Sequence, residues 1–426
     1  MTDNELLIKV RADSDKATKE LGRLTKEVDK LTKQVGKSNK TWSNNKKSFD
    51  SVSKATASFN KQLAGLAATY LSFQGAKQLV QTTADVESGF IGVAKTTGLV
   101  GEEFKKLENE LLNMSTSMAG VELSGLQSVA ETAGQLGISG VDNILEFTRV
   151  ITMMGTATDL SAEDAATAMA KLGNSMGIPV EEFERLGSVI NELSNNTTAT
   201  ANDLVNMGQR ISGTGKTFGL TADEVLAFSA TLTDVGMSAE LGGTAISKVM
   251  VQMLKDTEGF AEASGVSLEE FSDTIKNKPI EALKLFISEL GKLEKGAKIQ
   301  TLDDLGLKSS GVTQTMLKLS NATDTLTKNL ALAGDEWVRN TSLQTEYETA
   351  ASGLEAQWKR VENSLTVLGY KVGQELLPMF KELIDDTVRW FDTLDSGAVE
   401  HPDKKRIIIK ANRFIWHLLQ LRYTHK

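Results

Sequence analysis

Residues 218–254 read FGLTADEVLAFSATLTDVGMSAELGGTAISKVMVQML, and the fold prediction rests on this stretch. Apolar residues recur at helical spacing on both sides of Gly242 and Gly243. Glycine inside a helix costs about 0.5–1 kcal/mol relative to alanine, so these residues are expected in a turn. The stretch therefore predicts two short amphipathic helices with a hinge at the glycine pair.

Glycines with similar surroundings occur earlier in the chain, where each closes a helical pattern. A glycine at the end of a helix adopts the left-handed conformation without steric cost, which favours a turn at these positions. The glycines that we predict to lie in turns or hinges are Gly134, Gly137, Gly173, Gly177, Gly215, Gly219, Gly242 and Gly243.

Helix starts in the same region are marked by hydroxyl residues. Ser161 and Thr221 each precede an acidic residue by three positions, which is the pattern of a helix N-cap. Related patterns begin at Val121, Leu160 and Ala199, at intervals of 39 residues. This spacing is typical of a helix–turn–helix repeat.

A heptad pattern runs through residues 21–79. Apolar residues alternating by three and four form one seam, which predicts a coiled coil or a helix packed along a partner. The alternative is one amphipathic helix lying on its own protein. The seam consists of Leu21, Leu24, Val28, Leu31, Val35, Trp42, Phe49, Val52, Phe59, Leu63, Leu66 and Tyr70.

Together these patterns predict an all-α protein with several regions. A coiled-coil-like N-terminal helix is followed by a glycine-punctuated core of helical hairpins and by further long helices. Pro279 suits the first turn of one of these helices, and the last runs from Ala350 to Phe391, with Pro378 interrupting it. The predicted regions are an N-terminal segment with a possible short strand (1–20), the heptad region (21–79), the Ala/Gly-rich repeat core (80–255), a helical region (256–397) and an atypical basic tail (398–426).

Composition bounds the class of protein. The chain of 426 residues is 40% apolar and contains no cysteine, which excludes disulfides and thiolate chemistry. The net charge is +5 over residues 1–60, −19 over the middle and +5 over residues 398–426. An acidic middle argues against a nucleic-acid-binding core. We see no signal peptide and no apolar run of about 18 residues, so we expect no membrane span.

The basic tail, residues 398–426, differs abruptly from the preceding sequence. All three histidines lie there, beside a Lys-Lys-Arg triplet that three isoleucines follow. A membrane-surface or nucleic-acid-binding tail is one interpretation. We favour the other, that non-native or frameshifted sequence begins near Gly397, and we assign the tail no function.

One motif invites a nucleotide-binding interpretation. Residues 213–217, Gly-Thr-Gly-Lys-Thr, end like a phosphate-binding loop, but Arg210 stands where that loop requires its first glycine. We therefore expect a turn connecting helices. Adjacent acids point in different directions on a helix, and the histidines lack metal-ligand spacing. We predict no catalytic residue, no cofactor and no metal site, and hence no enzyme.

The order of features resembles the N-terminal and core region of phage tail tape measure proteins. The similarity covers residues 5–395. It begins in the lysine-rich heptad segment, and family members usually continue much further than this chain. The other segments that carry it are Ala84-Asp85-Val86-Glu87-Ser88-Gly89-Phe90, Phe218-Gly219-Leu220-Thr221, Gly242-Gly243-Thr244-Ala245 with Met253-Leu254, and Gly373-Gln374-Glu375-Leu376-Leu377-Pro378.

The resemblance implies a structural protein of a phage or prophage tail, assembled in the host cytoplasm. Such proteins template polymerisation of the tail tube, set tail length and aid DNA ejection. The implied partners are the tail tube protein, tail assembly chaperones, tail-tip or baseplate proteins and further copies of the chain through the coiled coil. The alternative function is a bacterial helical scaffold or interaction protein with no role in a virion.

Overall fold

The computed structural model describes residues 73–371, 373 and 374. Throughout this part of the chain the secondary structure is helical, without strands, which confirms the all-α prediction. The possible strand within residues 1–20, the coiled-coil seam from Leu21 to Tyr70, Pro378 and the basic tail lie outside the described residues. The chain divides into two units, and the larger, Glu87–Leu365, is described throughout its length.

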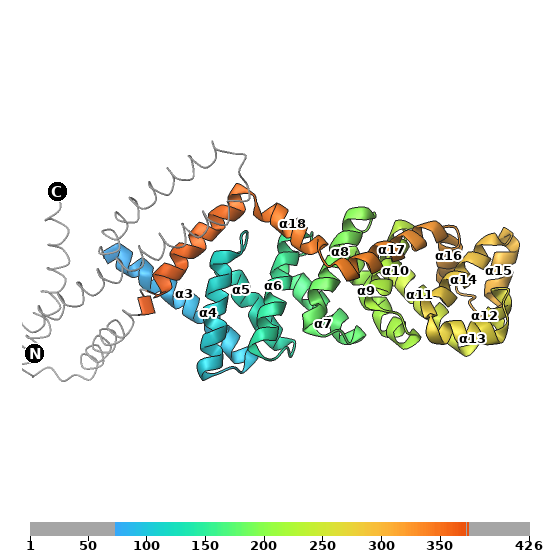
Figure 1. Ribbon diagram of the computed structural model, residues 1–426, viewed down its shortest axis with the longest axis horizontal. Helices are drawn as coiled ribbons and strands as arrows, with labels where there is room; N and C mark the ends of the chain where they lie inside the picture. Colours follow the sequence, from blue (N-terminus) through green and yellow to red (C-terminus); the bar gives the residue numbers. More distant parts are fainter. Residues whose placement is uncertain (1–72, 372, 375–426) are drawn as a thin grey trace, which may run out of the picture. The chain divides into compact units, whose positions relative to one another are not determined.

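Helices follow one another with short connections (Figure 1). A last helix, over residues 354–371, follows α18. The others are α3 (Phe73–Thr97), α4 (Gly101–Ser117), α5 (Leu123–Gln135), α6 (Val141–Ala157), α7 (Ala162–Met176), the 3-10 turn η2 (Val180–Glu182), α8 (Phe183–Asn196), α9 (Ala201–Phe218), α10 (Ala222–Asp234), α11 (Ala239–Lys255), α12 (Thr257–Ala263), α13 (Leu268–Asn277), α14 (Pro279–Lys292), α15 (Lys295–Asp304), α16 (Ser310–Leu319), α17 (Thr323–Arg339) and α18 (Ser342–Ala351).

Helices α5 to α11 form a stack of helical pairs within the larger unit. Helices α5, α7 and α9 begin at Leu123, Ala162 and Ala201, at intervals of 39 residues. Helix α7 contacts both α5 and α9, and α9 contacts α11, while α8 contacts both α6 and α10. Two rows of helices result, and each pair buries its apolar face against the next, as repeat proteins do.

The junctions between successive pairs repeat the same hydrogen bonds. Thr158 and Thr197 lie just beyond α6 and α8, and each hydroxyl donates to the carbonyl four residues earlier at 2.8 Å. Each hydroxyl also accepts from the N–H two residues later, at 3.2 Å. Ser161 and Thr200 then cap α7 and α9 by accepting the N–H three residues later, at 3.1 Å. These bonds satisfy backbone groups that a helix end leaves free.

The last helices of the unit return along the stack. Helix α17 contacts α10 and α8, and α18 contacts α8 and α6 (Figure 1, orange). The buried Asn363 then joins the final helix to the α4–α5 connection by donating to the carbonyls of Ser115 and Val121, at 2.7 and 2.6 Å. The return closes a face of the stacked pairs that would otherwise remain open to solvent.

A large apolar core extends from α9 to α17. Phe228, Phe260, Phe271 and Phe286 are fully buried, and the rings of Phe260 and Phe286 pack edge to face with centroids 4.7 Å apart. Burial of each such side chain contributes about 1.5–3 kcal/mol. Among the described residues, no helix is both long enough and apolar enough to cross a membrane.

The stretch 218–254 forms two helices, α10 and α11, as expected, but its hinge lies elsewhere. The turn is at Gly236, with a φ of 71°, and Ser238 caps the start of α11. Gly242 and Gly243 lie buried inside α11, so the predicted hinge there is wrong. A Cβ on Gly243 would lie 2.9 Å from the Cβ of Arg210, so glycine at this position allows α11 to approach α9 closely.

The other predicted turn glycines divide into two groups. Gly137, Gly177 and Gly219 follow α5, α7 and α9 with φ values of 82°, 72° and 102°. Gly134, Gly173 and Gly215 lie inside those same helices, so the turn prediction is wrong for them. At these positions the missing side chain makes room for a neighbour; a Cβ on Gly134 would lie 2.6 Å from the backbone of Thr96.

Two expectations about later helices have different outcomes. Pro279 occupies the first position of α14, as predicted, where its missing N–H has no intrahelical partner to lose. The continuous helix expected from Ala350 onward is interrupted, because α18 ends at Ala351 and the next helix begins at residue 354.

Candidate interaction site

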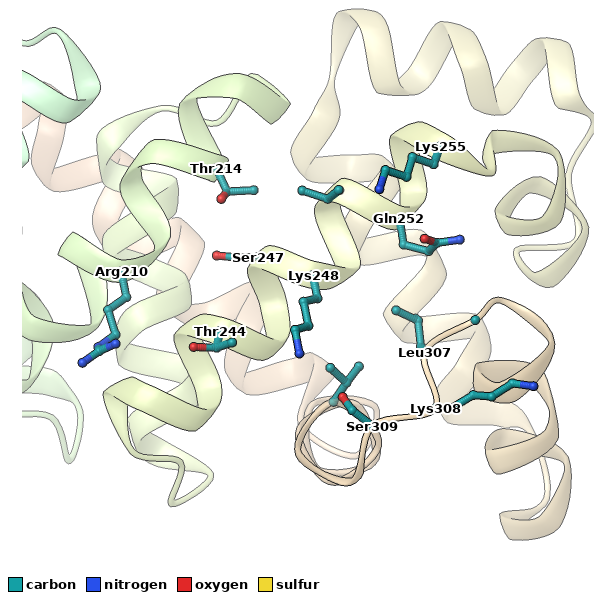
Figure 2. Close-up of a pocket in the computed structure, with 13 residues that line it drawn as sticks. Arg210, Thr214, Thr244, Ser247, Lys248, Gln252, Lys255, Leu307, Lys308 and Ser309 are labelled. Carbon is teal, nitrogen blue, oxygen red and sulfur yellow. The ribbon is translucent and has the colours of Figure 1, made fainter.

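A cleft of about 720 Å³ lies between α9, α11 and the loop that joins α15 to α16 (Figure 2). We call it the cationic cleft, because four basic residues and no acidic residue line it. Its lining consists of Arg210, Thr214, Thr244, Ser247, Lys248, Val251, Gln252, Lys255, Gly306, Leu307, Lys308, Ser309 and Val312.

Helix α11 supplies the floor of the cleft. Thr244, Lys248, Val251 and Lys255 follow one another at intervals of four, three and four residues, which places them on one face of the helix. The opposite face buries apolar side chains in the core, including Val249 and Met253. The amphipathic pattern of α11 therefore turns two lysines and an exposed valine toward the cleft.

Helix α9 supplies one wall through Arg210 and Thr214, which lie one turn apart. The guanidinium of Arg210 pairs with Glu240 at 3.3 Å, and both side chains are exposed, so the pair contributes little to stability. Ser247 of α11 lies on the side of the cleft that faces α9, and its inaccessible hydroxyl has no hydrogen-bond partner among the residues that the structure describes.

The opposite wall is the α15–α16 connection. Gly306, two residues beyond α15, has a φ of 74°, and the N–H of Leu307 donates to the carbonyl of Leu302 at 2.8 Å. Leu307 and Val312 are buried in the core, whereas Lys308 is exposed. The apolar anchors therefore hold the loop in place while its lysine remains in solvent.

The charges of the cleft are largely uncompensated. Lys248, Lys255 and Lys308 form no ion pair with any residue that the structure describes. In Figure 2, Lys248 extends from the floor toward the α15–α16 loop, while Arg210 and Lys308 extend outward at the two rims. Like charges around one concave surface raise the local potential, so the arrangement is suited to anionic groups.

Of the phosphate-loop-like motif, residues 213–217, only Thr214 lines the cationic cleft. Residues 213–217 form the last turns of α9, so the expected helix-connecting turn is wrong for this segment. The hydroxyl of Thr217 donates to the carbonyl of Gly213 at 3.0 Å, within the helix. A wrapped loop with free N–H groups, which phosphate binding requires, is absent here.

Adjacent acids lie in the first turns of α7, α10 and α13, whereas Asp303 and Asp304 are the last residues of α15. Glu224 accepts from the N–H of Thr221 at 2.9 Å, and Asp164 contacts the hydroxyl of Ser161 at 2.6 Å. Burial raises the pKa of the Glu224 carboxyl above its ordinary value of 4.5. Within the described part of the chain, no group of three or more His, Asp or Glu residues could hold a metal ion.

Sequence reasoning did not find the cationic cleft, because its walls come from segments about 100 residues apart. One signal was present: Lys248 and Lys255 flank Val251 at helical spacing on the polar face of a predicted helix. The predicted coiled-coil seam from Leu21 to Tyr70 lies outside the described residues, so the structure does not place it beside the cleft or apart from it.

The stacked helical pairs place the described part of the chain in the class of all-helical, repeat-like proteins. Residues 108–345, more than half of the chain, match the phage-related minor tail protein family, and the chain belongs to this family. Over 343 residues the chain is 24% identical to the probable tape measure protein of Halomonas phage phiHAP-1. The alignment covers 74% of this chain and 38% of that relative. No solved structure matches.

These similarities confirm the resemblance found in the sequence. The family is one of phage-related minor tail proteins, and membership in it implies a location in the tail of a virion. Because the chain spans about two fifths of the length of the named relative, the function of the whole relative applies to this chain only as a proposal.

Proposed function

We propose that the chain acts as a tape measure protein, which templates assembly of the tail tube and sets tail length. The observation that carries this proposal is its similarity, over 74% of its length, to a protein named a probable tape measure protein. The heptad pattern predicted over residues 21–79 supports it, because an extended helix converts residues into length at about 1.5 Å each.

The proposed partners are the tail tube protein, the tail assembly chaperones and the tail-tip or baseplate proteins. We further propose that copies of the chain associate through the heptad seam in residues 21–79, since a sustained seam of this kind needs an apolar partner. The larger unit, with its buried core, then serves as a folded binding module at one point of the tail.

Tail length in the parent phage tests this function. An in-frame deletion of about six heptads within residues 21–79 preserves the seam register and removes about 63 Å of helix. We expect tails shortened by about this length in electron micrographs, rounded to whole rings of the tube. A duplication of the same heptads is the matched control, and we expect it to lengthen tails equally.

Unchanged tail length in both variants would exclude the chain from setting length. Mass spectrometry of purified virions separates the proposal from the alternative, a bacterial scaffold without a virion role. The proposal requires peptides of this chain in intact tails, and their absence would favour the alternative.

A further inference from the structure

We infer that the cationic cleft is a docking site for an acidic, amphipathic segment of another protein. In this arrangement carboxylates of the segment lie beside Lys248 and Lys255, and an apolar side chain lies on Val251. The inference concerns the binding chemistry of the cleft, and it holds whether or not the chain sets tail length.

The first support is the charge of the cleft. Its floor and both rims contribute cations, and Glu240 offsets only Arg210. The middle of the chain carries a net charge of −19, so a set of basic residues without an acidic lining residue departs from its surroundings. A bound carboxylate would provide the partner that Lys248, Lys255 and Lys308 lack among the described residues.

The second support is the apolar surface between the lysines. Val251 lines the cleft between Lys248 and Lys255 and is 41% exposed; Leu254, which lies outside the lining on the next turn, is 44% exposed. A small inorganic anion would use the charges and leave this apolar surface in water. A segment that alternates acidic and apolar residues at helical spacing would cover both, and apolar contact is what gives such an interface its stability.

The lining is poorly suited to a nucleic acid. Single strands bind on aromatic platforms, and no aromatic residue lines the cleft. A duplex presents charge over many base pairs, and the acidic middle of this chain would repel it outside the cleft. Residues 1–60 carry a net charge of +5, and so do residues 398–426, which is the same sign as the charge of the cleft. We therefore assign the acidic docking segment to a different protein.

Fluorescence anisotropy with the full-length chain tests the inference. The probe is a labelled synthetic peptide that carries glutamates and leucines at helical spacing, and its comparison is the same peptide with lysine in place of glutamate. The cleft variant is Lys248→Glu with Lys255→Glu. The matched control is Lys171→Glu with Lys276→Glu, which changes the net charge equally at exposed lysines on α7 and α13.

We expect the acidic peptide to bind the unaltered chain and to lose at least about tenfold in affinity with the cleft variant, because attraction becomes repulsion at two positions. The control variant should lose less than about twofold. The cleft variant should in turn bind the lysine peptide more tightly than the unaltered chain does. Thermal melts followed by circular dichroism should be alike for all three chains.

Several outcomes would overturn the inference. One is equal loss in the cleft and control variants, which would show non-specific charge attraction. Another is tighter binding of a labelled duplex or single-stranded DNA than of the acidic peptide, with the same sensitivity to the cleft variant. A third is self-association of the chain that the cleft variant abolishes in sedimentation experiments, which would make a second copy the occupant.

Discussion

At the scale of single residues, the glycines of this chain perform two different tasks. Gly219 ends α9 in the left-handed conformation, with a φ of 102°, where a side chain would be strained. Gly173 and Gly243 instead lie inside helices and face a neighbouring element at short range. For these residues the helical propensity lost with glycine is offset by closer packing between helices.

Replacing two of the helical glycines with alanine should therefore change the stability of the fold in opposite directions. A Cβ on Gly173 would lie 2.5 Å from the ring of Phe183, so Gly173→Ala should destabilise the fold by about 1–3 kcal/mol through overpacking. The nearest atom to a Cβ on Gly213 is 3.8 Å away, so Gly213→Ala should stabilise by about 0.5–1 kcal/mol. Urea denaturation of both variants measures the two differences.

The two glycine variants control for each other, because each replaces a helical glycine with the same residue. Destabilisation by Gly213→Ala would contradict the placement of residues 213–217 inside α9. Full stability of Gly173→Ala would show that Phe183 can move aside, and the packing explanation for this glycine would then fail.

At the scale of elements, the start of α10 combines a capping carboxylate with burial. Glu224 accepts from the N–H of Thr221, while burial raises the pKa of its carboxyl. A raised pKa means that the folded chain keeps a proton that the unfolded chain has already released. This contribution to stability is complete below the unfolded pKa and is lost as the pH rises through the folded pKa.

Replacing Glu224 with glutamine should remove this pH dependence. Glutamine keeps an acceptor for the N–H of Thr221 but does not titrate, so the stability of the unaltered chain should fall relative to Glu224→Gln as the pH rises above the ordinary pKa of 4.5. Urea denaturation of both chains at several pH values measures the difference. A difference that stays constant, or that grows in favour of the unaltered chain as the pH rises, would contradict the burial of this carboxyl.

The elements also show what the sequence can and cannot predict. Hydroxyl caps such as Ser161 and Thr221 are local signals, and they located the starts of α7 and α10 correctly. The 39-residue spacing likewise matched the starts of α5, α7 and α9, because each pair folds with its neighbours in sequence. Whether a glycine ends a helix or packs inside one depends on its neighbours in space, which is why Gly242 and Gly243 were misassigned.

The same distinction explains why the candidate site was missed. Arg210 and Lys308 are nearly 100 residues apart in sequence, and they line the same cleft only because α16 packs against α11. The return of α17 along α10 depends on contacts such as Asn329 with Thr231, at 3.2 Å, across a similar separation. A single sequence carries periodicity and caps, but it does not show which distant faces are complementary.

At the scale of the whole molecule, the main question is whether the larger unit stays folded inside a tail. The core between α9 and α17 would expose many large apolar side chains if the helices separated, at about 1.5–3 kcal/mol for each. Tail assembly would have to compensate for that loss to extend the unit. We therefore expect Glu87–Leu365 to remain folded and to add far less length than about 1.5 Å for each residue.

A cysteine pair can test this expectation because the chain contains no cysteine of its own. The hydroxyl oxygens of Ser175 in α7 and Ser212 in α9 are 2.8 Å apart, so cysteines at the two positions would bring their sulfurs within reach of an S–S bond of about 2.05 Å. We expect Ser175→Cys with Ser212→Cys to form a disulfide in assembled tails, visible as faster migration in non-reducing gels, with tails of normal length. The control pairs Ser175→Cys with Ser272→Cys on α13, which Figure 1 shows well apart from α7, and it should stay reduced. If α7 and α9 separate during assembly, the first pair will also stay reduced in tails, and an oxidised chain will assemble poorly. That result would show that the stacked helices unfold into the ruler, and every residue of the unit would then count toward tail length.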